Sequence, residues 1–104
     1  MKNNYTFKII WGKSYIGLAV DKNLNESITV PLTSFFFWPR ENGWELLKVE
    51  LQNKPWIKKE DTIEILNGYT ILINYWLSNV EKIEGITKLI QDSSIYNFEL
   101  LANL

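Results

Sequence analysis

Two short stretches place basic and aromatic side chains next to a proline. The first is Trp38-Pro39-Arg40, which contains the one arginine of the chain. Because its guanidinium group is a planar fork of N–H donors, Arg40 could bind a phosphate or a base edge through two parallel hydrogen bonds. A salt bridge to Glu41, Glu45 or another carboxylate, or stacking on Trp38, is the competing structural role.

The second stretch is Lys54-Pro55-Trp56, and Lys58 and Lys59 follow it closely. Lysines around an indole ring could follow an RNA backbone while the ring stacks on an unpaired base. Solvated turn lysines over a buried ring are an equally good interpretation. The candidate binding residues are therefore Trp38, Arg40, Lys54, Trp56, Lys58 and Lys59, and Lys8 and Lys13 are weaker candidates.

Catalytic chemistry has little support in this composition. The chain contains no cysteine and no histidine, so it lacks a thiolate nucleophile, the usual general base and the commonest metal ligands. Its carboxylates suit the first turns of helices, where negative charge is favoured, better than a catalytic pair. These carboxylates are Glu41, Glu45, Glu60, Asp61 and Glu64. We expect no enzyme activity, no metal, no cofactor and no small-molecule substrate.

The length and the net charge of the chain further limit the kinds of protein that it can be. A chain of 104 residues with 46% apolar composition is long enough to form one domain with its own core. The formal net charge of -1 argues against a protein that coats nucleic acid indiscriminately, so any RNA contact must be local. No apolar run is long enough for a membrane helix, and the first residues lack a signal-peptide core. We therefore expect no membrane partner and no export.

The first thirty residues have the alternation of β-strands. Residues 5–11 and 15–20 are predicted to pair as an antiparallel hairpin around a turn at Gly12-Lys13-Ser14. Gly17 should permit close approach of a neighbouring backbone. Residues 27–30 are β-branched and short, and they could add a third strand at the edge of the sheet.

Two helices are predicted next. The first begins at Trp38-Pro39-Arg40-Glu41, because proline suits the first turn of a helix, and Asn53-Lys54-Pro55 ends it. Its core stripe is Trp44, Leu47 and Leu51. The second runs from Glu60-Asp61-Thr62 to about Asn79. It has two adjacent apolar stripes, of which one is Ile63, Leu66, Thr70, Ile73 and Leu77 and the other is Ile65, Tyr69, Leu72 and Trp76.

A helix that is apolar over so much of its circumference is either buried on more than one side or docked on a partner. We prefer burial between the sheet and the first helix. Trp11, Trp44 and Trp76 are assigned to the core. Trp38 and Trp56 each neighbour a proline at a helix boundary, where a ring can be half covered and half presented to a partner, although the core is the preferred place for both.

The last quarter of the chain is less regular. Residues 80–94 suit a third amphipathic helix, and residues 95–104 could pack back on the fold or hang free. The expected fold class is α+β, with an antiparallel hairpin or small three-stranded sheet packed against two helices and a possible third, C-terminal helix.

The chain resembles the plastid-specific ribosomal protein 3 family of chloroplasts and cyanobacteria. The matching segments, in the family's order and spacing, are "FKIIWGKSYIGLAVD", Phe36-Phe37-Trp38-Pro39-Arg40, Trp44, Lys54-Pro55-Trp56-Ile57 and Ile73-Asn74-Tyr75-Trp76. The resemblance covers about residues 6–77, so residues 1–104 are expected to form one small domain with a C-terminal extension over 80–104. Gly43 and Gly68 depart from the pattern, where ordinary helix formers are expected.

This resemblance implies a structural constituent of the small ribosomal subunit with a role in translation. Its partners would be small-subunit ribosomal RNA and neighbouring ribosomal proteins, with one copy of the chain acting as a monomer within the ribosome. The location would be the plastid stroma, or the cytoplasm if the source is a cyanobacterium. The alternative is a free protein–protein interaction module that regulates translation and grips its partner through the wide apolar face of the second helix.

Overall fold

The alternating N-terminal residues form the predicted hairpin. The computed structural model describes residues 4–25, 27–79 and 97–104, and in it strand β1 (Tyr5–Trp11) pairs antiparallel with β2 (Ile16–Asn23). The turn between them closes with a hydrogen bond of 3.0 Å from the Gly12 N–H to the Tyr15 carbonyl. Every second side chain of β1, from Tyr5 to Trp11, is buried, so one face of the hairpin carries the core.

Two short strands extend the sheet beyond β2. The predicted edge strand is present as β3 (Thr29–Pro31), which pairs antiparallel with residues 21–23. A further strand, β4 (Phe36–Trp38), pairs antiparallel with residues 16–18 on the same side of β2. The sequence did not predict β4.

The first helix begins later than its proline suggests. Helix α1 (Gly43–Gln52) is capped by Asn42, whose side-chain oxygen accepts a hydrogen bond of 3.4 Å from the Glu45 N–H. The predicted start at Trp38-Pro39-Arg40-Glu41 is wrong, because the pairing with β2 keeps the chain extended through Trp38 and the polar Asn42 side chain supplies the cap. The predicted end of the helix is confirmed.

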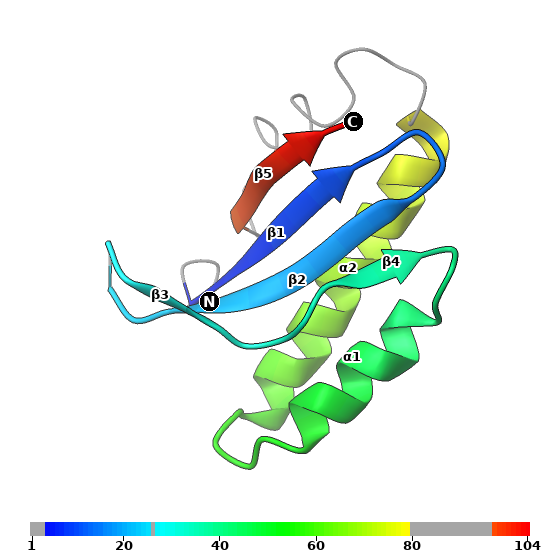
Figure 1. Ribbon diagram of the computed structural model, residues 1–104. Coiled ribbons are helices and arrows are strands. Elements are labelled where there is room, and N and C mark those ends of the chain that lie inside the picture. Colours follow the sequence, from blue (N-terminus) through cyan, green and yellow to red (C-terminus); the bar gives the residue numbers. More distant parts are fainter. Residues whose placement is uncertain (1–3, 26, 80–96) are drawn as a thin grey trace.

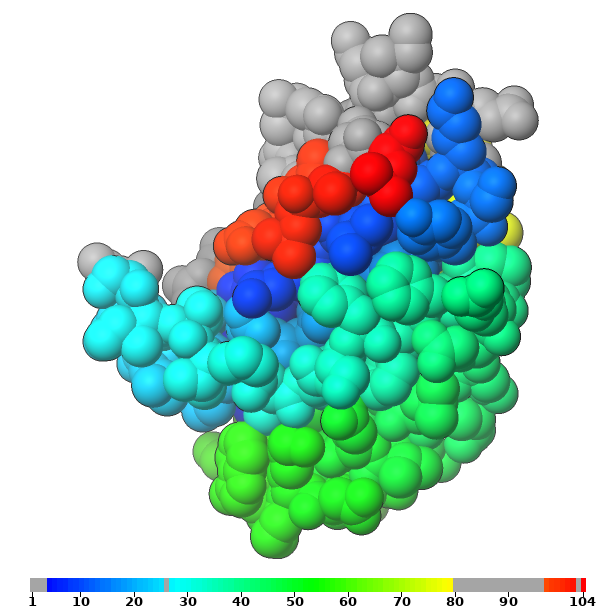
Figure 2. Space-filling model, viewed as in Figure 1, coloured from blue at the N-terminus to red at the C-terminus, as the bar shows by residue number. Residues whose placement is uncertain are grey.

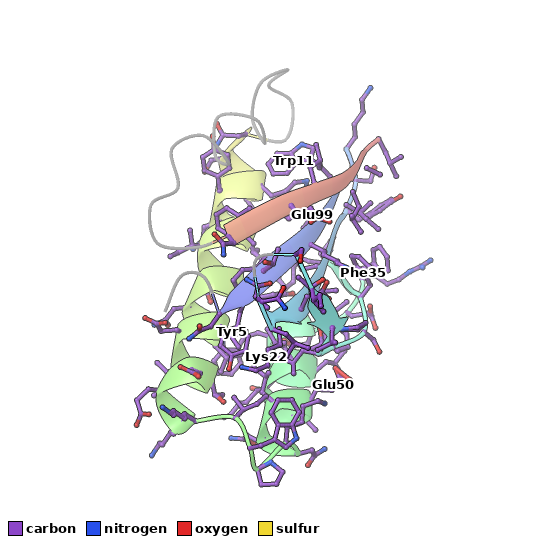
Figure 3. The ribbon with its side chains drawn as sticks, turned by 90° about the vertical axis from the view of Figure 1, so that its left-hand side faces the viewer. Tyr5, Trp11, Lys22, Phe35, Glu50 and Glu99 are labelled. Carbon is purple, nitrogen blue, oxygen red and sulfur yellow. The ribbon has the colours of Figure 1, made fainter. Side chains whose placement is uncertain are left out.

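Helix α2 (Lys59–Asn79) lies beside α1 on one face of the sheet (Figure 1). The stripe Ile65, Tyr69, Leu72 and Trp76 is buried throughout. The neighbouring predicted stripe is only half buried, since Leu66 and Ile73 are covered and Ile63, Thr70 and Leu77 are exposed. The prediction that α2 is buried between the sheet and α1 is therefore confirmed for one side of this helix and wrong for the other. Figure 3 shows α2 on one side of the strands.

The C-terminal residues complete the sheet. Strand β5 (Asn97–Asn103) runs parallel to β1, and the strand order is β3-β2-β1-β5, with β4 off this path. The rings of Phe7 and Phe98 lie 5.7 Å apart between their centroids, and the Leu104 N–H donates to the Trp11 carbonyl at 2.7 Å. The sequence predicts that residues 95–104 either pack back on the fold or hang free. From Asn97 onward, they pack on the fold. The possible third helix over 80–94 lies outside the described residues.

The α+β class is confirmed, with a mixed and larger sheet than the predicted one. The buried cluster between sheet and helices includes Phe7, Ile9, Ile16, Leu18, Val20, Leu47, Leu51, Ile65, Leu72 and Trp76. Within the described parts of the chain, no helix has the length and apolar character needed to cross a membrane.

Candidate nucleic-acid interface

The six candidate binding residues do not converge on one site. Trp38 and Arg40 lie before the N-terminus of α1. The other four lie at the opposite end of that helix, three of them in the turn between α1 and α2 and Lys59 as the first residue of α2 (Figure 1). Ten helical residues at 1.5 Å each separate the two groups by about 15 Å. The chain therefore presents two small surfaces, which we call the helix turn (residues 53–59, including the first residue of α2) and the strand turn (residues 38–42).

In the helix turn, Trp56 faces solvent. Its side chain is 60% exposed, whereas the next residue, Ile57, is 8% exposed and belongs to the core cluster. The preferred core position for Trp56 is therefore wrong, because Ile57 takes the inward position and the Ile57 N–H closes the turn on the Lys54 carbonyl at 3.0 Å.

The lysines of the helix turn surround this exposed ring in the sequence. Lys58 and Lys59 are exposed, and Lys54 is half-buried, with its ammonium group 3.4 Å from the Glu50 carbonyl oxygen. Lys54 thus interacts with the C-terminal carbonyls of α1, where a positive charge is favoured. Lys58 and Lys59 are the cations of this turn that are open to an outside partner.

In the strand turn, Arg40 is exposed and Trp38 is half-buried against the core. Glu41 faces another way, since its carboxylate accepts a hydrogen bond of 2.8 Å from the Phe37 N–H. In the described residues, the ion pair present is Lys8 with Asp21, and Arg40 pairs with no carboxylate. The competing salt-bridge role proposed for Arg40 is not what the structure contains.

Arg40 instead lines a pocket that sequence reasoning missed. The pocket has a volume of about 570 Å³ and is lined by Ser14, Tyr15, Phe37, Pro39 and Arg40. The Tyr15 and Phe37 rings meet edge to face, with centroids 5.7 Å apart and an interplanar angle of 71°. A signal was available in the run "FFFW", because alternation in an extended segment places Phe37 on the face opposite Phe36 and Trp38.

The Phe37 ring packs directly against Gly17. A Cβ atom at Gly17 would lie 2.6 Å from Cε1 of the Phe37 ring, which is too close for a side chain to fit. The close approach predicted at this glycine is real, but the approaching group is an aromatic ring and not a backbone.

The two weaker lysine candidates differ from each other. Lys8 forms a 2.7 Å ion pair with the buried carboxylate of Asp21, and this hydrogen-bonded pairing raises the pKa of Lys8 above its ordinary value. Its charge already stabilises the sheet. Lys13 is exposed in the hairpin turn, next to the pocket residue Ser14.

Two tyrosines carry their hydroxyl groups into the buried core. The Tyr5 hydroxyl donates to the Asp61 carboxylate at 3.0 Å, and burial together with this carboxylate raises the pKa of Tyr5 to about 12. Burial and the charge of Glu41 raise the pKa of Tyr69 to about 12. Both tyrosines pack among core residues, so we assign them to the fold.

The helices also leave apolar side chains in solvent. Leu46 and Val49 on α1 are 40% and 52% exposed, and Ile63, Ile71 and Leu77 on α2 are similarly open. Of these residues, Ile63 and Leu77 belong to the predicted apolar face of the second helix and are not covered by the fold.

Comparison with known proteins connects the helical part of the molecule to a described family. Residues 32–79 match the model of a family described as plastid and cyanobacterial ribosomal protein (PSRP-3 / Ycf65). The matched region runs from the loop before β4 to the last residue of α2, so it contains both the strand turn and the helix turn.

Curated relatives extend the similarity over most of the chain. Small ribosomal subunit protein cS23 of Gracilaria tenuistipitata var. liui is 42% identical over 96 residues, which is 92% of this chain and 95% of the relative. Probable small ribosomal subunit protein cS23 of Synechococcus sp. (strain JA-3-3Ab) is 46% identical over 72 residues, 69% of this chain and 72% of the relative. In Arabidopsis thaliana, small ribosomal subunit protein cS23z is 41% identical over 72% of this chain and 45% of the relative.

Proposed function

The chain belongs to the plastid and cyanobacterial ribosomal protein family PSRP-3 / Ycf65, and we propose that it is a structural constituent of the small ribosomal subunit that contacts ribosomal RNA through the two turns flanking α1. The observation that carries the proposal is the 42% identity, over 92% of the chain, to a relative named as a small ribosomal subunit protein. The protein works where such ribosomes are found, in the plastid or in the cyanobacterial cytoplasm.

This role is structural, without catalysis or a cofactor. The chain sits in the subunit as a monomer and touches RNA and neighbouring ribosomal proteins. The RNA contact at the helix turn is supported by the exposed ring of Trp56 and the exposed Lys58 and Lys59 beside it. Such a ring can stack on an unpaired base, while the ammonium groups neutralise phosphates.

The proposal is tested by sedimentation of the tagged protein on sucrose gradients at increasing salt. We expect the protein to travel with the small subunit at low salt and to leave it as salt rises, because phosphate contacts are screened. Lys58→Ala with Lys59→Ala should shift this release to lower salt without changing the melting temperature. The matched control is Lys22→Ala with Lys48→Ala, which removes the same charge elsewhere. A wild-type protein that stays at the top of the gradient at low salt would refute the proposal.

A second candidate, a free interaction module that regulates translation, is favoured by the exposed Leu46, Val49, Ile63, Ile71 and Leu77. Such a module would hold its partner through apolar contacts with little salt dependence. A pull-down from RNase-treated lysate separates the two candidates, since an RNA-held constituent of the subunit loses most of its partners and an interaction module keeps its partner.

A further inference from the structure

We propose that the pocket of Ser14, Tyr15, Phe37, Pro39 and Arg40 binds one unpaired nucleotide of RNA, with the base against the aromatic rings and the phosphate on Arg40. The inference rests on the proposed function, because it names the chemical group that the strand turn holds in the subunit. It adds Tyr15 and Phe37 to the candidate binding residues.

The pocket lies on the face of the sheet that the helices leave open. Phe37 pairs with Gly17 across β4 and β2, and its ring covers this glycine on the side away from α1 and α2. Figure 3 shows the neighbouring Phe35 on the side of the sheet away from α2. In Figure 2, which views this open face, the β1–β2 turn and the segment around β4 meet side by side.

The aromatic surface continues beyond the pocket. Phe35 stacks on Phe37 with centroids 6.2 Å apart and an interplanar angle of 27°, and Tyr15 meets Phe37 edge to face. Three rings therefore stand in a row along this edge of the sheet, and all are half-buried rather than covered. Stacking on such rings holds single-stranded nucleic acid with little dependence on base identity.

Charge selects a nucleotide over an apolar peptide for this pocket. The one charged residue among the lining residues is Arg40, which is exposed and pairs with no carboxylate in the described structure. Glu41, the nearest acidic residue in the sequence, is held by the Phe37 N–H, and Lys13 stands beside Ser14 in the hairpin turn. A planar cation next to aromatic rings suits a phosphate joined to a base.

Both walls of the pocket are fixed before any ligand arrives. On one side, the Trp76 indole N–H donates to the Gly12 carbonyl at 2.8 Å, which ties the hairpin turn to α2. On the other, the pairing of β4 with β2 and the Glu41 carboxylate hold the Phe37 backbone. Binding to a pre-ordered pocket loses little conformational freedom, and this favours affinity.

The test uses the full chain and small subunits stripped of it by high salt. Rebinding is measured for the wild type, Tyr15→Leu, Tyr15→Phe and Arg40→Gln, together with the melting temperature of each variant. Loss of the Tyr15 ring or of the Arg40 fork should weaken rebinding about tenfold to a hundredfold. Tyr15→Phe keeps the ring and is the matched control, so its affinity should stay within about twofold of wild type. Ultraviolet cross-linking of the rebound subunit should join a nucleotide to the peptide containing Tyr15 or Phe37.

The possible results are distinct. If the wild type and both disruptive variants rebind equally well, the nucleotide pocket is refuted while the ribosomal role stands. A cross-link from this pocket to another ribosomal protein refutes it as well, because the occupant is then a peptide. If the wild type does not rebind stripped subunits at all, the proposed function fails and this inference fails with it.

Discussion

At the scale of single residues, glycine decides how closely two aromatic rings approach the backbone. Gly17 lies under the Phe37 ring, and Gly43 lies against the side chain of Tyr69. Gly43 opens α1 and Tyr69 lies within α2, so this contact brings the two helices together. The resemblance leads us to expect an ordinary helix former at position 43, and the structure explains the glycine there by the space that Tyr69 occupies.

Replacing Gly43 with alanine tests this explanation. Alanine in a helix is normally the better residue by roughly 0.5–1 kcal/mol. Here the added Cβ would overlap the Tyr69 hydroxyl and lie 2.8 Å from Cζ of its ring, so we expect a net loss of about 1–3 kcal/mol in the free energy of unfolding. Urea denaturation measures the change. Tyr69→Phe in the same chain should restore part of the loss, whereas a Gly43→Ala protein more stable than wild type would contradict the account.

The two buried tyrosines predict the response to alkaline pH. Because the pKa values of Tyr5 and Tyr69 are raised from 10.0 to about 12, the unfolded chain loses these protons first. Their contribution to stability is complete below pH 10 and is lost as pH rises from 10 towards 12. Each tyrosine should lower the free energy of unfolding by up to about 1.4 kcal/mol per pH unit in this range.

Tyr69→Phe separates the two contributions. The Tyr69 hydroxyl is buried without a hydrogen-bond partner in the described structure, so its removal should cost little at pH 7. Between pH 10 and 12, the variant should lose stability less steeply than the wild type, because Tyr5 and Lys8 keep their raised pKa values and Tyr69 no longer contributes. Denaturation curves at several pH values give both quantities, and an unchanged slope would show that Tyr69 does not resist ionisation.

At the scale of elements, periodicity predicts the hairpin, most of α2 and one of its two stripes, and the proline at position 55 predicts the end of α1. It fails where pairing with a distant segment defines the element. Strand β4 is three residues long, too short for a period, and exists through its pairing with β2. In β5 the alternation is broken, because the register with β1 shifts between Ile9 and Ile10 and leaves Leu101 as an extra residue.

The same reasoning applies to the binding residues. Local sequence identifies the helix turn, where the lysines and Trp56 are neighbours in the chain. The pocket at the strand turn brings together Ser14, Tyr15 and Arg40 from two segments, and only the fold places them side by side. The division into a family core over residues 6–77 and an extension over 80–104 stays a prediction, although residues 97–103 are a strand of the same sheet.

Two adjacent leucines in β5 test its packing. Leu100 is half-buried and packs against the core, whereas Leu101, at the irregular position, is 48% exposed. We expect Leu100→Ser to lower the free energy of unfolding by about 2 kcal/mol, because it removes buried apolar surface and adds a hydroxyl. Leu101→Ser is the control and should stay within about 0.5 kcal/mol of wild type. Equal, negligible effects in urea denaturation would mean that β5 does not pack in solution.

At the scale of the whole molecule, the layered fold separates structural and binding roles. One face of the sheet is covered by α1 and α2 (Figure 1). The contacting rings of Tyr15, Phe37 and Phe35 lie on the opposite face, where Figure 3 labels Phe35. The helix turn, with Trp56, lies at the far end of α1. If both turns bind RNA as proposed, the protein would join RNA segments that lie about a helix length apart, as a permanent component of an assembly does.

The central claim is that the protein is a structural constituent of the small ribosomal subunit. The most direct test of this claim is the copy number of the protein across ribosomal fractions. Quantitative mass spectrometry would compare it with another small-subunit protein in free small subunits, whole ribosomes and polysomes. A structural constituent should be present at about one copy per small subunit in all three fractions. Two results would contradict a structural role: a protein confined to the top of the gradient, or a protein found in one fraction at far less than one copy per small subunit.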